Sequence, residues 1–257
     1  MTGEDPRRPD LTLLLQSLAG TYLRNTRRAD GACARCAGLT NPGYVTCYQC
    51  QYDYPAALPD LAGFMTYAAD GTQAGALMYG YKASMPQREH QIVITLLMQR
   101  ALVTHRSCPA TIVGAPVTHW ATVPSTKRRP GPHPLHALVA GLRGDPELAL
   151  AHASGVAPRR KHVVSGLFQA NGTVPTGSHV LLIDDTWTSG GTVLSAVHTL
   201  QQAGASFVTV LSIARWLSFD FMSRPRPNHV VGPLHDALLR QRVYDVAACP
   251  YTDSACP

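Results

Sequence analysis

The stretch His179 to Thr192, HVLLIDDTWTSGGT, limits the fold of this chain more than any other part of its sequence. Its four apolar residues, Val180 to Ile183, form the short unbroken run that is typical of a strand buried in a parallel sheet. Apolar residues at helical spacing then predict a helix from Thr192 to Ala203, which Gly204 would end. A further apolar run, Phe207 to Ala214, predicts the next strand. This order predicts an α/β fold with a largely parallel, twisted sheet and flanking helices.

Other elements follow from the spacing of apolar residues along the chain. We expect a strand or strand–helix junction over Gly75 to Lys82, and a buried strand over Thr111 to Val117. We expect helices over Gln91 to His105 and over Pro134 to about Arg143. A short strand is expected over Val163 to Phe168. Near the amino end, Asp10 is expected to cap a short amphipathic helix. No segment has the roughly 20 apolar residues that span a bilayer, which favours a cytoplasmic protein with no membrane partner.

The loop between the strand predicted over Val180 to Ile183 and the helix predicted from Thr192 suits an anion. In parallel sheets, ligands bind beyond the carboxyl ends of the strands, where this loop lies. Its backbone N–H groups and hydroxyls, at the start of a helix, would cradle a phosphate. Asp184 and Asp185 could accept hydrogen bonds from sugar hydroxyls or lie near a magnesium ion. The combination indicates a site for a sugar 5-phosphate, with two aspartates that merely cap a helix as the alternative.

The pattern resembles the motif of type I phosphoribosyltransferases that binds 5-phosphoribosyl 1-pyrophosphate (PRPP): four apolar residues, two acids and a T-[ST]-G-x-T loop. The resemblance implies that Asp184 and Asp185 hold the ribose 2- and 3-hydroxyls and stabilise positive charge on the sugar. It implies 5-phosphate binding by Thr188, Ser189, Gly190, Gly191 and Thr192. It also implies Mg²⁺ bound with PRPP, and displacement of pyrophosphate from C1 by a nitrogen nucleophile of unknown identity.

Basic residues outnumber acidic ones by 22 to 16, and the net charge of +6 favours an anionic partner. Two loops concentrate this charge. In the loop that follows Thr122, the resemblance implies pyrophosphate binding by Ser125, Thr126, Lys127 and Arg128. In the loop from Ala157 to His162, it implies a flexible cover carrying Arg159, Arg160 and Lys161. A solvated basic surface is the alternative for both loops.

Four of the seven cysteines form the pattern C-x2-C-x10-C-x2-C: Cys33, Cys36, Cys47 and Cys50. The surrounding residues 31–60 have too little apolar mass to fold by burial alone. Two such pairs place four thiolates in tetrahedral reach, as in a structural zinc ribbon. Iron and disulfide bonds are the alternatives. A closed site of this kind is structural and predicts no catalysis.

A cysteine ribbon followed by this motif is similar to the ComF family, which is tied to competence and DNA uptake. LMYGYK, Leu77 to Lys82, and LSIAR, Leu211 to Arg215, add to the likeness. In the first basic loop, KRRPGPHPLH stands where the family carries an R-x-R-G-F-N-type segment. The resemblance implies an amino-terminal helix and zinc-ribbon module over residues 1–57 and a phosphoribosyltransferase-like domain over residues 58–257.

The leading hypothesis is therefore a PRPP-dependent phosphoribosyltransferase. A non-catalytic sensor of PRPP or nucleotides is one alternative, and a ComF-like protein that binds nucleic acid through the ribbon and basic loops is another. The acceptor would lie under a hood formed by some of residues 55–90 and the carboxyl-terminal tail. Neither the acceptor nor the oligomeric state follows from the sequence.

The remaining histidines and thiols receive more ordinary interpretations. His133 and His136 lack an acidic or cysteine partner nearby in sequence, so they are interpreted as helix-cap or surface histidines rather than metal ligands. Cys108 is interpreted as a core residue. Cys249 and Cys256 could form a shared ligand site, a redox pair or inert thiols.

Overall fold

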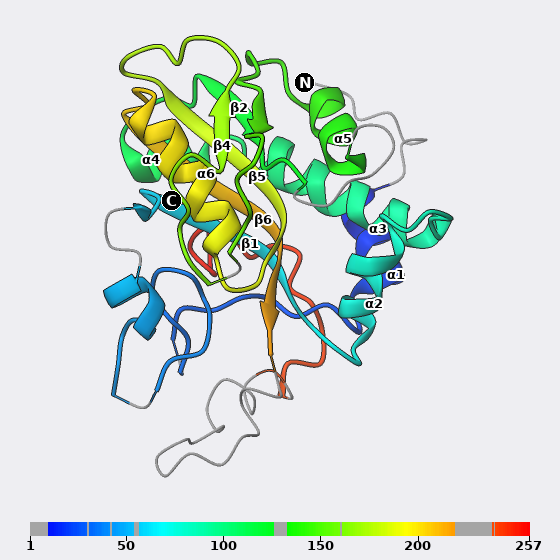
Figure 1. Ribbon diagram of the computed structural model, residues 1–257. Helices are drawn as coiled ribbons and strands as arrows, with labels where there is room; N and C mark the ends of the chain where they lie inside the picture. The colour runs from blue at the N-terminus through cyan, green and yellow to red at the C-terminus, as the bar shows by residue number, and fades with distance from the viewer. Residues whose placement is uncertain are drawn as a thin grey trace.

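The computed structural model describes residues 10–29, 31–41, 43–53, 57–125, 133–159, 161–218, 238 and 240–257. At its centre lies a parallel sheet with the strand order β1-β6-β5-β2 (Figure 1). These strands are β1 (Leu61–Ala69), β2 (His119–Thr122), β5 (His179–Trp187) and β6 (Phe207–Leu217). A separate antiparallel pair is formed by β3 (Leu150–His152) and β4 (Phe168–Ala170). The predicted α/β fold with a parallel sheet is confirmed.

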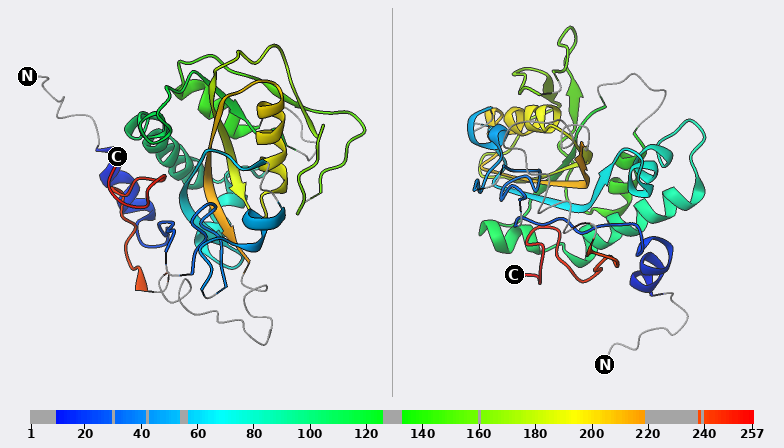
Figure 2. Two further views of the ribbon diagram at one scale, coloured as in Figure 1. Left: turned by 90° about the vertical axis from the view of Figure 1, so that its left-hand side faces the viewer. Right: turned by 90° about the horizontal axis from the view of Figure 1, so that it is seen from below.

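Helices cover both faces of the sheet, as the left view of Figure 2 shows. One face carries α6 (Gly191–Gln202). The other carries α1 (Leu11–Ala19), α3 (Arg88–Gln99), the π-helical turn η3 (Arg100–Thr104) and α5 (Pro134–Leu142), while α2 (Gln73–Gly80) follows β1. Because β5 is covered on both sides, alternate residues of its apolar run enter different cores. This double burial explains the unbroken apolar sequence of β5.

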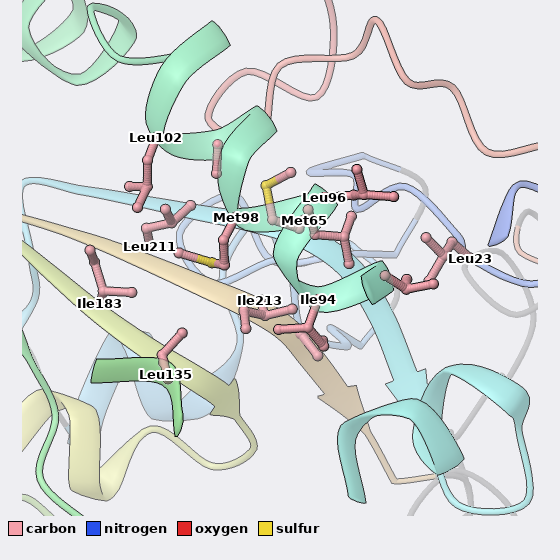
Figure 3. Close-up of a cluster of buried hydrophobic side chains, with 14 of the residues drawn as sticks. Leu23, Met65, Ile94, Leu96, Met98, Leu102, Leu135, Ile183, Leu211 and Ile213 are labelled. Carbon is pink, nitrogen blue, oxygen red and sulfur yellow. The ribbon is translucent and has the colours of Figure 1, made fainter. Parts of the chain in front are cut away.

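The larger helical face has a core of branched and sulfur-containing side chains (Figure 3). Ile183 of β5 and Leu211 of β6 lie here beside Met98 of α3 and Leu102 of η3. Val180 and Leu182 of β5 pack instead in the core beneath α6. The carboxyl edge of the sheet is thereby fixed between two packed layers.

Several sequence predictions are confirmed by these elements. Asp10 caps α1, its carboxylate accepting from the N–H of Thr12 at 2.9 Å. The helices predicted over residues 91–105 and 134–143 correspond to α3 with η3 and to α5. Gly204, with a φ of +112°, follows α6 at the predicted stop. The strand expected over residues 163–168 lies slightly later, at β4.

The strand predicted over residues 111–117 is wrong, and so is the first of the two alternatives for residues 75–82, a strand or a strand–helix junction. Residues 111–117 fall partly in the helix α4 (Cys108–Val113), and the neighbouring strand β2 begins only at His119. Pro109 near its start and Gly114 in the left-handed conformation at its end delimit this short helix. Residues 75–82 form most of α2, which Thr72 caps by accepting from the N–H of Gly75 at 3.0 Å. The first strand is β1 (Leu61–Ala69). Its alanines and glycine weaken the apolar pattern by which a strand is predicted.

The outer edge of β1 is covered by segments from both ends of the chain. The N–H of Phe64 donates to the carbonyl of Pro250 at 3.1 Å, and that of Tyr67 donates to the carbonyl of Arg24 at 2.8 Å. Figure 2 shows the carboxyl-terminal segment in red beside the blue amino-terminal segment. Such pairing protects an edge strand from other chains.

In the described part of the chain, no helix combines the length and the hydropathy that crossing a bilayer requires. The cytoplasmic location and the division of the chain at residues 57 and 58 stay predictions.

Candidate functional site

The two aspartates of the predicted motif lie within β5 rather than after it. The strand continues through Asp184 and Asp185 to Trp187, and Asp184 pairs in register with Ser212 of β6. On the other side, the N–H of Val123 donates to the carbonyl of Ile183 at 3.0 Å, so the first basic loop begins beside the acids. The carboxylates are therefore carried by a rigid strand at the carboxyl edge of the sheet.

Asp185 is the centre of a polar cluster drawn from three distant parts of the sequence. One of its carboxylate oxygens lies 2.5 Å from Nζ of Lys82 and accepts from the hydroxyl of Tyr81 at 3.0 Å. Nε2 of His133 lies 3.5 Å from the same oxygen. Burial works to raise the pKa of Asp185, but the charge and hydrogen bond of Lys82 outweigh it, with His133 and Tyr81 adding to the lowering. Asp185 is therefore an anion at neutral pH.

Asp184 has the opposite electrostatic environment. Its carboxylate accepts from the N–H of Asp185 at 2.9 Å. Burial, together with the negative charge of Asp185, raises the pKa of Asp184 to about 8. Two adjacent acids thus have pKa values moved apart, which is the situation found at many functional sites. At neutral pH the pair holds one firmly placed negative charge and one carboxyl group that readily keeps a proton.

The loop after β5 leads directly into the amino end of α6. Gly190 is the N-cap, with a φ of +90°. An added Cβ there would lie 3.0 Å from Nε1 of Trp187, so glycine suits both the conformation and the space. Because a glycine N-cap has no side chain, it cannot accept from the N–H groups of the first turn. These N–H groups and the exposed residue Thr188 lie at the start of α6, where phosphate binding stays a prediction.

The buried side chain of Arg215 on β6 stabilises the start of the loop that follows β5. Nη1 donates to the carbonyls of Trp187 at 3.0 Å and Thr188 at 2.7 Å. Nε donates to the carbonyl of Cys36 at 2.6 Å, and the side chain is only 6% exposed. One buried guanidinium therefore joins the cysteine module to the start of the predicted phosphate loop.

The four cysteines of the predicted ribbon converge, and we call them the ribbon cluster. The sulfur atoms of Cys33, Cys36, Cys47 and Cys50 all lie within 4.8 Å of one another. Sγ of Cys36 lies 3.7 Å from Sγ of Cys47, close to the ~3.8 Å edge of a tetrahedron with zinc–sulfur bonds. The N–H of Cys33 donates to the carbonyl of Gly38 at 2.6 Å, which closes the turn around the first pair. The donor set and spacing fit a structural zinc ion.

The basic loops are only partly described. Ser125 is exposed at the end of the described segment that follows β2, whereas Thr126, Lys127, Arg128 and Arg160 lie outside the described residues. The second loop is tied to α6, since the N–H of Val164 donates to the hydroxyl of Ser195 at 2.9 Å. Arg159 lines a hollow formed by residues of this loop, and the described lining includes neither aspartate. Lys161 is exposed on the same loop.

Sequence reasoning did not assign Tyr81, Lys82 or His133 to the site. The first two end the segment LMYGYK, but no local pattern indicates contact with an acid about a hundred positions later. The helix-cap interpretation of His133 is confirmed, because Nδ1 accepts from the N–H of Leu135 at 3.2 Å. Its other ring nitrogen faces Asp185. His136 lies 2.8 Å from Glu147, an acidic partner 11 positions away.

No family model and no curated protein matches this chain. Among solved structures, the adenine phosphoribosyltransferase of Leishmania donovani is similar, with 18% identity, a TM-score of 0.36, and coverage of 60% of this chain and 78% of that one. The adenine phosphoribosyltransferase of Saccharomyces cerevisiae shows 19% identity, a TM-score of 0.33, and coverage of 50% and 70%. At these TM-scores the similarity says nothing about function, so the functional interpretation depends on the geometry of the site itself.

Proposed function

We propose that this protein is a magnesium-dependent phosphoribosyltransferase that displaces pyrophosphate from C1 of PRPP with a nitrogen nucleophile. The observation that carries the proposal is the order of two features in one segment of the chain. A pair of carboxylates lies on β5, and Gly190 caps the start of α6 three residues beyond Trp187. A sugar phosphate can span these two features, with its hydroxyls on the acids and its phosphate on the loop. Neither feature alone would select this ligand.

The acids would act on the sugar. Asp184 and Asp185 would accept from the ribose 2- and 3-hydroxyls, and the Asp185 anion would stabilise positive charge that develops on the ring as the bond to pyrophosphate breaks. Thr188, Ser189, Gly190, Gly191 and Thr192 would bind the 5-phosphate. Carboxylate oxygens suit Mg²⁺, which would enter with PRPP and neutralise charge on the leaving group.

Lys82 has a role that depends on which anion is present. In the free protein its ammonium group neutralises Asp185 at 2.5 Å. We expect the incoming pyrophosphate to compete for this cation, which releases Asp185 to accept from the ribose. The candidates in the two basic loops would supply further contacts to the leaving group: Ser125, Thr126, Lys127 and Arg128 in the first, and Arg159, Arg160 and Lys161 in the second.

The proposal is tested by calorimetric titration of PRPP with Mg²⁺ into the wild-type protein and into Asp184→Asn with Asp185→Asn. We expect the double variant to bind at least tenfold more weakly, since the pair loses the negative charge of Asp185 and each side chain keeps only one acceptor oxygen. Asp70→Asn is the matched control, because Asp70 is exposed in the turn after β1. Equal affinity of the wild type and the double variant would remove the basis of the proposal.

Pyrophosphate release then separates transfer from binding alone. Wild-type protein is incubated with PRPP, Mg²⁺ and a panel of purine, pyrimidine and amine acceptors. Release that depends on both the acceptor and the aspartates supports a transferase. Tight PRPP binding without release would favour the regulatory sensor instead.

A nucleic-acid contact is a second candidate function, favoured by the surface of the ribbon. Tyr44, Tyr48 and Tyr52 are all more than half exposed, and the rings of Tyr48 and Tyr52 lie 5.1 Å apart. Arg35 is exposed on the same module. Exposed aromatic rings near a cation can stack on bases. This function predicts that the wild-type protein binds single-stranded DNA with an affinity that falls steeply as salt is added. It also predicts that Tyr48→Ala binds the same DNA more weakly than the wild type.

A further inference from the structure

A second group of side chains that could bind a metal is separate from the ribbon cluster, and we call it the tail cluster. It consists of His105, Cys108, Cys249 and Cys256, whose ligand atoms all lie within 4.8 Å of one another. The first two residues flank the turn between η3 and α4. The other two come from the carboxyl-terminal tail, about 150 positions later in the sequence.

The distances within the tail cluster match a tetrahedral site. Nδ1 of His105 lies 3.2 Å from Sγ of Cys256 and 3.8 Å from Sγ of Cys108. The nitrogen–sulfur edge of a tetrahedron around zinc is about 3.5 Å, from bonds of about 2.0 and 2.3 Å. His105, Cys108 and Cys249 are buried, whereas Cys256 is exposed and would close the site from the solvent side.

We propose that His105, Cys108, Cys249 and Cys256 bind a second structural zinc ion. Three thiolates and one imidazole form a closed coordination set of the kind found in structural zinc sites. With all four positions supplied by the protein, no position is left for substrate. The inference does not depend on the proposed transferase activity.

The backbone of the tail is shaped to bring its two cysteines together. The N–H of Cys249 donates to the carbonyl of Ser254 at 2.6 Å, and the N–H of Asp253 donates to the carbonyl of Cys249 at 2.9 Å. Asp253 adopts a left-handed conformation with a φ of +60°. These bonds curl residues 249–256 into a closed loop, which returns Cys256 to the buried histidine.

Arg100 supplies the charge balance that such a site needs. A zinc ion with three thiolates and one neutral imidazole carries a net charge of −1. The guanidinium of Arg100 is almost fully buried beside it, with Nη2 at 2.9 Å from Nε2 of His105 and 2.9 Å from the carbonyl of Ala248. Its Nη1 is buried without a hydrogen-bond partner among the described residues. A nearby anionic metal centre would compensate this otherwise unbalanced cation.

The contact between Arg100 and His105 also defines the metal-free tautomer. Because the guanidinium donates to Nε2, the ring proton lies on Nδ1, where it points toward Cys256. Zinc would replace the proton on Nδ1, and the ring would then carry its proton on Nε2. We therefore expect Arg100 to keep the carbonyl of Ala248 and to release His105 when the metal binds.

The zinc would fasten the tail across the edge of the sheet. The hydroxyl of Tyr244 donates to the carbonyl of Met65, and Pro250 accepts from Phe64 of the same edge strand. The ring of Tyr251 lies so close to Gly63 that an added Cβ would be 2.5 Å from it. A metal at the tail cluster would join this covered edge to η3 and α4, and so lock three parts of the fold together.

The test is the zinc content of the full-length protein, purified under reducing conditions without chelator and measured by plasma mass spectrometry. We expect two zinc ions per chain in the wild type and one in Cys256→Ser. Because Cys256 is exposed, we expect its serine variant to fold. Ser254→Ala is the matched control in the same loop and should keep two ions.

A ribbon variant distinguishes the two sites. Cys50→Ser should also hold one zinc ion, and the combination with Cys256→Ser should hold none. Cobalt substitution gives a second readout, because Cys50→Ser should retain the absorption of a tetrahedral site with three thiolates, and Cys256→Ser that of a site with four. One zinc ion in the wild type that Cys50→Ser abolishes would overturn the proposal. So would two ions retained in Cys256→Ser, or a Cys249–Cys256 disulfide in freshly purified protein.

Discussion

The ribbon cluster and the tail cluster each gather four metal-binding side chains, but they do so by different routes. The ribbon cysteines lie within 18 consecutive positions, and the described residues around them have little regular structure beyond the π-helical turn η1 (Gln49–Asp53). In the tail cluster, a histidine and a cysteine at the turn between η3 and α4 meet two cysteines from the last nine residues. The tail cluster also adjoins the core between α3 and the sheet, to which Cys108 and Cys249 belong.

This difference predicts how strongly the folding of each region depends on a bound metal. The ribbon module has few large apolar residues, so metal coordination has to replace a hydrophobic core there. The tail is also held by buried tyrosines and by pairing with β1, so zinc would add to an existing set of contacts. We therefore expect metal loss to unfold the ribbon module and only to loosen the tail.

The largest expected effect is that of Cys50→Ser. Loss of one ligand should remove zinc from the ribbon cluster and unfold residues 31–53, because apparent zinc-binding free energies of such modules are about 10 kcal/mol or more. Limited proteolysis should cut the ribbon in the variant but not in the wild type. The circular dichroism of the sheet and helices should remain as a control. A protease-resistant ribbon in a zinc-free variant would erase the contrast between the two regions.

The second prediction concerns the link between the ribbon and the loop before α6, the proposed phosphate site. Arg215→Met should leave the carbonyls of Cys36, Trp187 and Thr188 without their buried donor, which we expect to cost about 3 kcal/mol or more of unfolding free energy. The affinity for PRPP should fall at least tenfold, because the loop before α6 loses its support. Urea unfolding and calorimetry measure the two quantities. Arg215→Lys, which keeps the charge and one donor group, should recover part of both.

The third prediction is the smaller effect of Cys256→Ser. Loss of zinc from the tail cluster should lower the unfolding free energy by about 2–4 kcal/mol, the range expected when a ligand present at 30 to 1,000 times its dissociation constant is removed. Thermal unfolding with and without added zinc measures this effect. The affinity for PRPP should be unchanged within a factor of two. A tenfold loss of PRPP affinity would show that the tail cluster, like the ribbon cluster, supports the ligand site.

The smallest expected effect concerns the charge of the aspartate pair, which neither metal site touches. The folded state raises the pKa of Asp184 to about 8, above its unfolded value near 4. This group therefore favours folding below pH 4, and that contribution is lost as the pH rises to 8. Asp184→Asn removes the dependence, so its stability relative to the wild type should be more than 1 kcal/mol higher at pH 8 than at pH 5. Urea unfolding at the two pH values tests the sign, and a constant difference would contradict the raised pKa.

Sequence patterns were reliable wherever the interacting residues are close along the chain. The apolar run of β5, the helical spacing of α6 and the cap at Asp10 are all local, and each led to the correct element. The strand predicted over residues 111–117 failed because its apolar letters suit either element. There, Pro109 and Gly114 decide for a short helix.

The sequence by itself determined the chemistry that this protein offers: two adjacent acids before a small-residue helix start, and four cysteines in two close pairs. Those features depend on spacings of a few residues, which backbone geometry converts directly into proximity. Only the tertiary structure decided that Lys82 neutralises Asp185, that Arg215 ties Cys36 to the loop before α6, and that His105 meets Cys256. These contacts join residues from 27 to 179 positions apart. Their proximity results from the packing of the whole sheet and its covering segments, which no local pattern encodes.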